Sequence, residues 1–203
     1  QIVLSTPADV TARILASQLP QSTLDALIEI PYAPIAIVHL GVDARVLPPE
    51  ILDGFGFLVP RYTGLDVLGA IWSSSLFCNR APGGKVLLTV FIGGATNPGV
   101  IESLENDQQT FLTHVLKELA QVFGLPQLIP AFWNISVKRR AIPQYTLGHV
   151  QRVQQIEAAF NEQDALWLAS NYLSGVALND CVKQGESVAQ KLIEIHKKGK
   201  GAV

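Results

Sequence analysis

Charged residues and long apolar runs are both scarce in this sequence, and each shortage excludes a class of protein. Only 16% of the 203 residues are charged, and the formal net charge is -2. Binding to nucleic-acid phosphates requires a basic face, which this composition does not supply. The longest apolar candidate, Val86 to Ile101, is interrupted by glycine and proline, so no membrane-spanning helix is predicted.

Cysteine and methionine are also rare. Cys78 and Cys181 are the only cysteines, and neither belongs to a CxxC motif or has a nearby histidine partner. This pattern excludes a zinc-ligand motif and a disulfide framework, and it is typical of reduced thiols in the cytosol. The chain has no methionine, and it begins at Gln1 within a segment that has the composition of a strand. We therefore expect it to be part of a longer protein.

No complete catalytic or nucleotide-binding motif is present. Gly54-Phe55-Gly56 begins like a dinucleotide fingerprint but lacks the third glycine and the following helix. Gly83-Gly84-Lys85 is followed by Val86, where a phosphate-binding loop needs serine or threonine. The histidines occupy unrelated positions, namely His39, His114, His149 and His196. The sequence thus predicts no catalytic acid, base or nucleophile and no metal site.

The sequence does contain 48% hydrophobic residues, arranged in strand-like and helix-like patterns. Runs rich in valine, isoleucine, leucine and phenylalanine, separated by glycine and proline, predict strands. The expected strands cover residues 33–42, 56–59, 67–75, 85–92 and 132–137. Most of them follow one another without a long intervening helix, which favours antiparallel or mixed pairing in an α+β fold.

Helices are predicted on both sides of these strands. The clearest apolar stripe ends at Gly124, a residue typical of a helix C-terminus, and Ser22 is a candidate cap for an earlier helix. The expected helices cover residues 7–15, 22–28, 105–123, 147–160 and 179–195. A frayed basic tail is expected from His196 onward.

A short turn that contains glycine connects a predicted strand over residues 165–172 to the last helix. Gly175 permits a tight turn, and Asn179 is expected to begin the helix. The first N–H groups of a helix lack intrahelical partners and carry a partial positive charge. From the residues alone two interpretations stay open: an ordinary connection between strand and helix, or an approach to an anion or an electron-rich ring.

Four strings along the chain resemble one family. They are GFGFLVP at residues 54–60, SSSLFCNRAP at 73–82, AIPQYTLGH at 141–149 and GVALNDC at 175–181. In this order they resemble the C-terminal part of the oxygen-dependent protoporphyrinogen oxidases, FAD-dependent flavoproteins of haem biosynthesis within the flavin amine oxidase superfamily. The resemblance extends over essentially the whole chain, and the two last strings are the most specific.

The resemblance implies a division of the chain between two functional domains. Residues 1–145 would form a mixed or antiparallel sheet with packed helices, as part of the substrate-binding domain. Residues 146–203 would return to the FAD-binding domain and supply the last strand and helix of its Rossmann-like fold. The N-terminal βαβ unit, which would bind the adenosine diphosphate half of FAD, is absent from this sequence. We therefore expect the isolated chain to be inactive without that segment as its partner.

Two sets of residues match binding positions of the family. The residues that would approach the isoalloxazine ring of FAD are Gly175, Val176, Ala177 and Leu178. Backbone dipoles there can stabilise the charge of a reduced flavin. On three successive strands, Leu58, Ile71 and Phe91 would form an apolar wall for a porphyrinogen. Isoleucine at position 71 replaces an expected leucine of the same volume. Without the resemblance, these three residues would be assigned to the core.

The implied reaction is the oxidation of protoporphyrinogen IX to protoporphyrin IX, in which hydride passes to FAD and O2 is the final acceptor. Two alternatives stay open: coproporphyrinogen III as the substrate, and a non-catalytic binding or structural module. The cysteine pattern favours a cytoplasmic location. Family analogy adds membrane contact that is peripheral at most, and homodimer formation stays an option. Nucleic acid is not expected as a partner.

Overall fold

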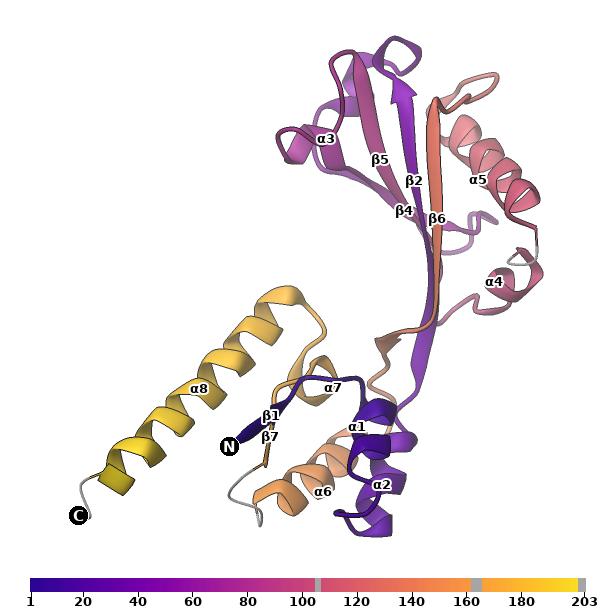
Figure 1. The fold of residues 1–203 in the computed structure, drawn as a ribbon. Coiled ribbons are helices and arrows are strands. Elements are labelled where there is room, and N and C mark those ends of the chain that lie inside the picture. The colour runs from indigo at the N-terminus through magenta and orange to yellow at the C-terminus, as the bar shows by residue number, and fades with distance from the viewer. Residues whose placement is uncertain (105–106, 162–165, 201–203) are drawn as a thin grey trace. The chain divides into compact units, whose positions relative to one another are not determined.

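The computed structural model describes residues 1–104, 107–161 and 166–200 (Figure 1). The chain folds into two compact units. The terminal unit consists of Gln1–Tyr32 and Pro143–Val203, and the central unit consists of Ala33–Ile142. The expected division between residues 145 and 146 concerns substrate and cofactor binding, and it stays a prediction.

A five-stranded sheet in the order β3-β4-β5-β2-β6 forms the central unit. Its strands are β2 (Tyr32–Asp43), β3 (Gly56–Leu58), β4 (Val67–Trp72), β5 (Lys85–Gly93) and β6 (Phe132–Pro143). The pairs β3/β4, β4/β5 and β5/β2 are antiparallel. Antiparallel neighbours need no long crossover helix, which agrees with the short connections in the sequence. The predicted α+β fold is confirmed.

Alternation along the strands buries one face of this sheet. On β2, Ala36, Val38 and Leu40 are buried, whereas the residues between them are partly exposed. Helix α5 (Gln108–Phe123) packs its apolar stripe against the buried face (Figure 1). The aromatic rings of Phe57, Trp72 and Phe123 meet there, with centroids 5.6 to 6.0 Å apart.

Helix α5 begins at Gln108, later than the expected Glu105, because Asp107 caps it. The Asp107 carboxylate accepts the N–H groups of Gln109 and Thr110. Gly124 adopts a φ of 65° and ends the helix, as predicted. Residues 105 and 106 lie outside the described residues. The shorter helices of the central unit are η1 (Ala44–Val46), η2 (Pro49–Leu52), α3 (Ser73–Leu76) and α4 (Gly99–Leu104).

The strand expected over residues 67–75 ends early, at Trp72, where α3 begins. The Ser73 hydroxyl lies 2.7 Å from the Thr89 hydroxyl, and the Ser74 hydroxyl accepts the Leu87 N–H at 2.9 Å. These side-chain bonds to β5 take the place of ladder bonds between backbones. The chain can therefore leave the sheet at this point.

The terminal unit combines segments from both ends of the sequence. β1 (Ile2–Leu4) pairs in parallel with β7 (Leu166–Leu168). Helices α1 (Ala8–Ile14), α2 (Gln21–Ile28) and α6 (His149–Asn161) contribute to a second hydrophobic core. The chain then forms α7 (Asn171–Ser174) and the long helix α8 (Leu178–Lys200). Among the described residues, no helix combines the length and apolar character needed to cross a membrane.

Several local expectations for the terminal unit are wrong. Ser22 does not cap α2, which begins at Gln21 after Pro20 without a side-chain cap. The expected strand over residues 165–172 is only three residues long, because the chain turns into α7 and buries Tyr172 in the core. Its first expected residue, Ala165, lies outside the described residues. Helix α8 begins at Leu178, one residue before Asn179, and continues through the segment expected to be frayed.

Candidate functional site

The turn before α8, formed by Gly175, Val176 and Ala177, carries three of the four residues predicted to contact a cofactor. Gly175 has φ of 134° and ψ of 132°, a conformation that favours glycine. The Ala177 carbonyl accepts the N–H groups of Asp180 (3.0 Å) and Cys181 (3.1 Å), which starts the helix. Leu178, the fourth predicted residue, is the first residue of α8.

Backbone donors are exposed at this turn. Within the described residues, the N–H groups of Val176 and Ala177 make no hydrogen bond. The N–H groups of Leu178 and Asn179 precede the first bond of the helical repeat, which Cys181 donates. The side chains of Val176 and Leu178 are 48% and 80% exposed. Together with the dipole of a 23-residue helix, these donors suit an anion or the electron-rich edge of a ring.

Tyr145, a residue of the AIPQYTLGH string, forms hydrogen bonds to the backbone at the turn. Its hydroxyl accepts the Gly175 N–H and donates to the Asn171 carbonyl, at 2.6 Å in each case. Burial raises the pKa of Tyr145, the charges of Asp180 and Cys181 raise it further, and the bond from Gly175 opposes them. The sequence assigned no role to Tyr145, although the string that contains it was one of the two most specific signals.

His149 lies under Tyr145 and is almost fully buried, with 5% of its surface exposed. The two rings stack with centroids 4.0 Å apart and an angle of 11°. Neither ring nitrogen has a hydrogen-bond partner among the described residues. Burial lowers the pKa of His149, and the charge of Arg152 lowers it further. His149 is therefore neutral at pH 7, and its ring supports the Tyr145 ring by stacking on it.

The three residues predicted to contact a substrate lie on neighbouring strands of the central unit. Leu58 on β3 pairs with Gly69 on β4, and Gly69 pairs with Phe91 on β5. Ile71 lies two residues further along β4, so that it shares their face of the sheet. Leu58 is 87% exposed, and Ile71 and Phe91 are partly exposed. None of the three is a core residue, although their role in substrate binding stays a prediction.

Gly69 lets β3 and β4 approach each other closely between Leu58 and Phe91. A Cβ atom at this position would collide with the Phe57 carbonyl oxygen and would lie 3.2 Å from the Leu58 side chain. The neighbours Ala70 and Val90 point to the opposite, buried face, where α5 packs. The arrangement is therefore an apolar wall of three strands, with no side chain at position 69.

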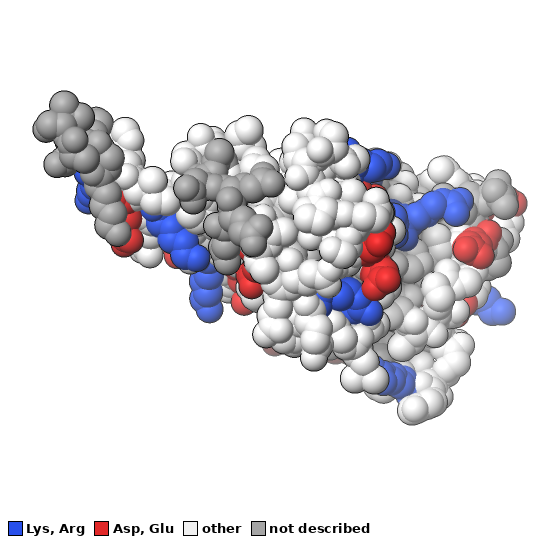
Figure 2. All heavy atoms as spheres, turned by 90° about the horizontal axis from the view of Figure 1, so that it is seen from below, with Lys and Arg blue, Asp and Glu red and all other residues white. Residues whose placement is uncertain are grey.

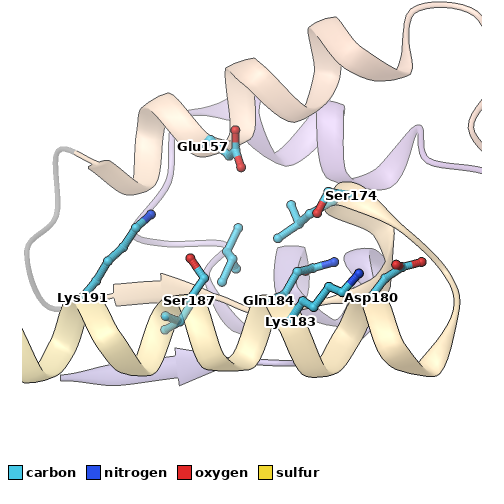
Figure 3. Close-up of a pocket in the computed structure, with 10 residues that line it drawn as sticks. Glu157, Ser174, Asp180, Lys183, Gln184, Ser187 and Lys191 are labelled. Carbon is cyan, nitrogen blue, oxygen red and sulfur yellow. The ribbon is translucent and has the colours of Figure 1, made fainter.

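A pocket of about 360 Å³ lies between α8, α6, β7 and α7 (Figure 3). Charged side chains of both signs line it, and the side-chain amide of Gln184 is buried there without a hydrogen-bond partner among the described residues. None of the predicted site residues lines this pocket. Figure 2 likewise shows acidic and basic side chains scattered among uncharged atoms on the face seen from below.

A second polar cluster, which the sequence did not indicate, lies in the central unit. His114 Nε2 is 2.9 Å from Asp66 Oδ2 and 3.4 Å from Glu118 Oε1. The buried Glu118 carboxylate also accepts the N–H groups of Asp66 and Val67 at 2.8 to 3.1 Å. Because these bonds satisfy the carboxylate and connect α5 to the start of β4, they explain the cluster as a structural connection.

Residues 1–193 match the family described as flavin containing amine oxidoreductase. The chain belongs to this family. Curated relatives include the chloroplastic protoporphyrinogen oxidases of Oryza sativa subsp. japonica and Nicotiana tabacum. They are 36% and 37% identical to this chain over 93% and 94% of its length, and 36% of each relative is covered. The chain thus spans about a third of the length of these relatives.

Other relatives are named for a different substrate. The coproporphyrinogen III oxidase of Propionibacterium freudenreichii subsp. freudenreichii is 31% identical over 95% of this chain and 35% of its own length. Among solved structures, a candidate protoporphyrinogen oxidase from Exiguobacterium sp. 255-15 has a TM-score of 0.70 and 22% identity, and covers 94% of this chain and 40% of that protein. A putrescine oxidase variant has a TM-score of 0.66 at 14% identity. These structures share the fold of this family member.

Proposed function

We propose that this chain is the part of an FAD-dependent porphyrinogen oxidase that forms the substrate wall and the flavin-facing helix start. The proposed reaction is the oxidation of protoporphyrinogen IX to protoporphyrin IX with O2 as acceptor. The observation that carries the proposal is the open turn at Gly175 to Leu178, with exposed backbone donors, in a member of a flavin-dependent family.

The turn suits the edge of an isoalloxazine ring. Gly175, with φ of 134°, lets the chain turn directly into α8, and Val176 and Leu178 offer exposed aliphatic surface. The N–H groups of Val176 and Ala177 can donate to ring oxygen or nitrogen atoms, and the helix dipole favours negative charge there. When bound, FAD supplies the acceptor for hydride. The chain's contribution is to hold the ring and to stabilise the charge that reduction adds.

The wall of Leu58, Ile71 and Phe91 suits the flat, apolar body of a porphyrinogen. Leu58 and Ile71 contribute aliphatic side chains next to Gly69, and the Phe91 ring adds a planar surface. Contact with a disc of this kind requires apolar area rather than charge. A role in positioning, rather than in proton transfer, agrees with the absence of an acid–base pair among the predicted site residues.

The flavin site is proposed to be completed by a dinucleotide-binding βαβ segment elsewhere in the protein. The turn at Gly175 offers contacts to one edge of a ring only, whereas the pyrophosphate of FAD needs a glycine-rich loop at a helix N-terminus. This chain contains no complete glycine fingerprint of that kind. The expected inactivity of the isolated chain follows from this division of the cofactor site.

Coproporphyrinogen III is a second candidate substrate. It is supported by the 31% identity of this chain to a coproporphyrinogen III oxidase, which approaches the 36% identity to the rice protoporphyrinogen oxidase. The two substrates share the macrocycle and differ in the carboxylates at its rim. An apolar wall binds both macrocycles, so that the residues near the rim must distinguish them.

A direct test compares the isolated chain with the product of the full coding sequence that contains it. Flavin absorbance would report cofactor content, and porphyrin fluorescence would report turnover with each porphyrinogen in air after correction for spontaneous oxidation. We expect flavin and turnover only in the longer protein. Turnover by the isolated chain would contradict the divided cofactor site. A longer protein with neither flavin nor turnover would instead favour a non-catalytic module.

A further inference from the structure

The Tyr145 hydroxyl occupies an unusual position in the backbone of the terminal unit. It accepts the N–H of Gly175 and donates to the carbonyl of Asn171, with both distances at 2.6 Å. These two backbone groups are four residues apart, which is the spacing of a hydrogen bond in an α-helix. The hydroxyl therefore stands between the two groups that would otherwise extend α7 by one bond.

This insertion explains why α7 ends where it does. Helix α7 stops at Ser174, and Gly175 departs from helical geometry, with φ of 134° and ψ of 132°. Groups inserted into the helical repeat are a recognised cause of bends and helix ends. A direct bond from the Gly175 N–H to the Asn171 carbonyl would tighten the backbone of residues 172–174 and would move Gly175, together with the turn that follows it.

The position of the hydroxyl is itself restrained. The Tyr145 ring stacks on His149 at 4.0 Å, and His149 is buried at the start of α6. Tyr145 and Gly175 are 30 residues apart in the sequence. The link is thus a tertiary contact between the AIPQYTLGH and GVALNDC strings, and the stack on the buried His149 ring restrains its Tyr145 side.

We infer that Tyr145 is a positioning residue for the flavin site: its hydroxyl keeps the turn open at Gly175, so that the N–H groups of Val176 and Ala177 face the cofactor. The inference rests on the proposed function. Tyr145 acts through the backbone, and its own hydroxyl is already occupied by two bonds within the protein.

The test uses Tyr145→Phe in the product of the full coding sequence, because this change removes the hydroxyl and keeps the ring. Tyr32→Phe is a matched control, since the Tyr32 hydroxyl also accepts a backbone N–H, that of Ala8 at 2.9 Å. We expect Tyr145→Phe to weaken FAD binding about tenfold, the effect of losing about one net hydrogen bond, and to shift the visible flavin spectrum and reduction potential. Tyr32→Phe should leave all three unchanged.

Each outcome distinguishes this inference from the proposed function. If the unmodified protein binds no flavin, the proposed function fails first, and the inference fails with it. If the unmodified protein binds flavin and Tyr145→Phe keeps the same affinity, spectrum and potential, only the inference is overturned. Equal changes in Tyr145→Phe and Tyr32→Phe would show general loosening of the terminal unit. Failure of Tyr145→Phe to fold, while Tyr32→Phe folds, would show that Tyr145 contributes to stability alone. Equal changes in the two variants and this folding failure would each overturn the inference.

Discussion

The carboxylate of Asp180 lies directly against the backbone of Gly175. A Cβ atom built on Gly175 would stand 2.5 Å from Asp180 Oδ2 and 2.6 Å from Asp180 Cβ. Non-bonded carbon and oxygen atoms do not approach so closely, so the first turn of α8 and the glycine fit together only without a side chain at position 175. Gly175 is thus required both by its dihedral angles and by its neighbour.

Substitution of Gly175 by alanine should destabilise the terminal unit. The φ of 134° costs about 1 to 3 kcal/mol for a residue with a side chain, and the contact with Asp180 adds to that cost. Gly185→Ala is the matched control, because a Cβ atom there meets no other atom within 4 Å and lies in a helix. It should be neutral or stabilising by up to about 1 kcal/mol. Urea denaturation of both variants checks the prediction, and equal stabilities would contradict it.

A negative charge at the turn before α8 should weaken FAD binding or lower the reduction potential of the flavin. Val176→Asp places a carboxylate beside the exposed donors, where it repels the negative charge of a reduced flavin by about 1 to 4 kcal/mol at 4 Å. In the longer protein we expect lower FAD content or a lower reduction potential. Val122→Asp, on the partly exposed side of α5 in the central unit, controls for the added charge. Normal flavin content and potential in Val176→Asp would remove the turn from the cofactor site.

Truncation of Phe91 tests the substrate wall. Because Phe91 is on the open face of β5, Phe91→Ala should raise the KM for the porphyrinogen about tenfold and leave the flavin spectrum intact. Leu88 on the same strand is fully buried, and Leu88→Ala should cost about 2 to 5 kcal/mol of stability. Steady-state kinetics and thermal unfolding separate the two effects. A Phe91→Ala protein that loses as much stability as Leu88→Ala would place Phe91 in the core.

Acidification should destabilise the terminal unit through His149. Its pKa is lowered in the folded state, so the unfolded chain binds the proton more readily. The stability that neutral His149 provides is therefore complete above its unfolded pKa of about 6.5 and is lost as the pH falls below that value. His149→Phe, which keeps an aromatic ring under Tyr145, should reduce the fall in unfolding free energy between pH 7 and pH 5. His196→Phe, on the exposed end of α8, should leave that fall unchanged.

The Glu118 carboxylate should contribute to the unfolding free energy of the central unit. Glu118→Gln retains the shape but replaces one oxygen, which accepts backbone N–H groups, by an amide that cannot accept them. We expect a loss of about 1 to 3 kcal/mol in unfolding free energy. Glu102→Gln, at an exposed position of α4, serves as the comparison. A loss of similar size in both variants would show that the buried bonds contribute little.

Local pattern was sufficient for much of the architecture. Apolar alternation predicted the five strands of the central sheet, and the stripe that ends at Gly124 predicted α5, because both periods depend on residues close together in the chain. The strings around Tyr145 and Gly175 also indicated the family from the sequence. Local pattern failed at Ser73 and at Asn171, where helices replace the expected strand ends. In both places, bonds or burial involving distant segments decide the conformation.

Tertiary structure decided which residues of the four strings lie on one face of the sheet and which are in contact. The sequence determined that Gly175 precedes a helix. It also determined that Leu58, Ile71 and Phe91 are apolar, but without the family resemblance their composition alone would assign them to the core. Strand pairing placed them on an open face, because register sets the side of the sheet. Likewise, only the folded chain brings the Tyr145 hydroxyl between Asn171 and Gly175, since hydrogen bonds between remote segments leave no periodic trace in a sequence.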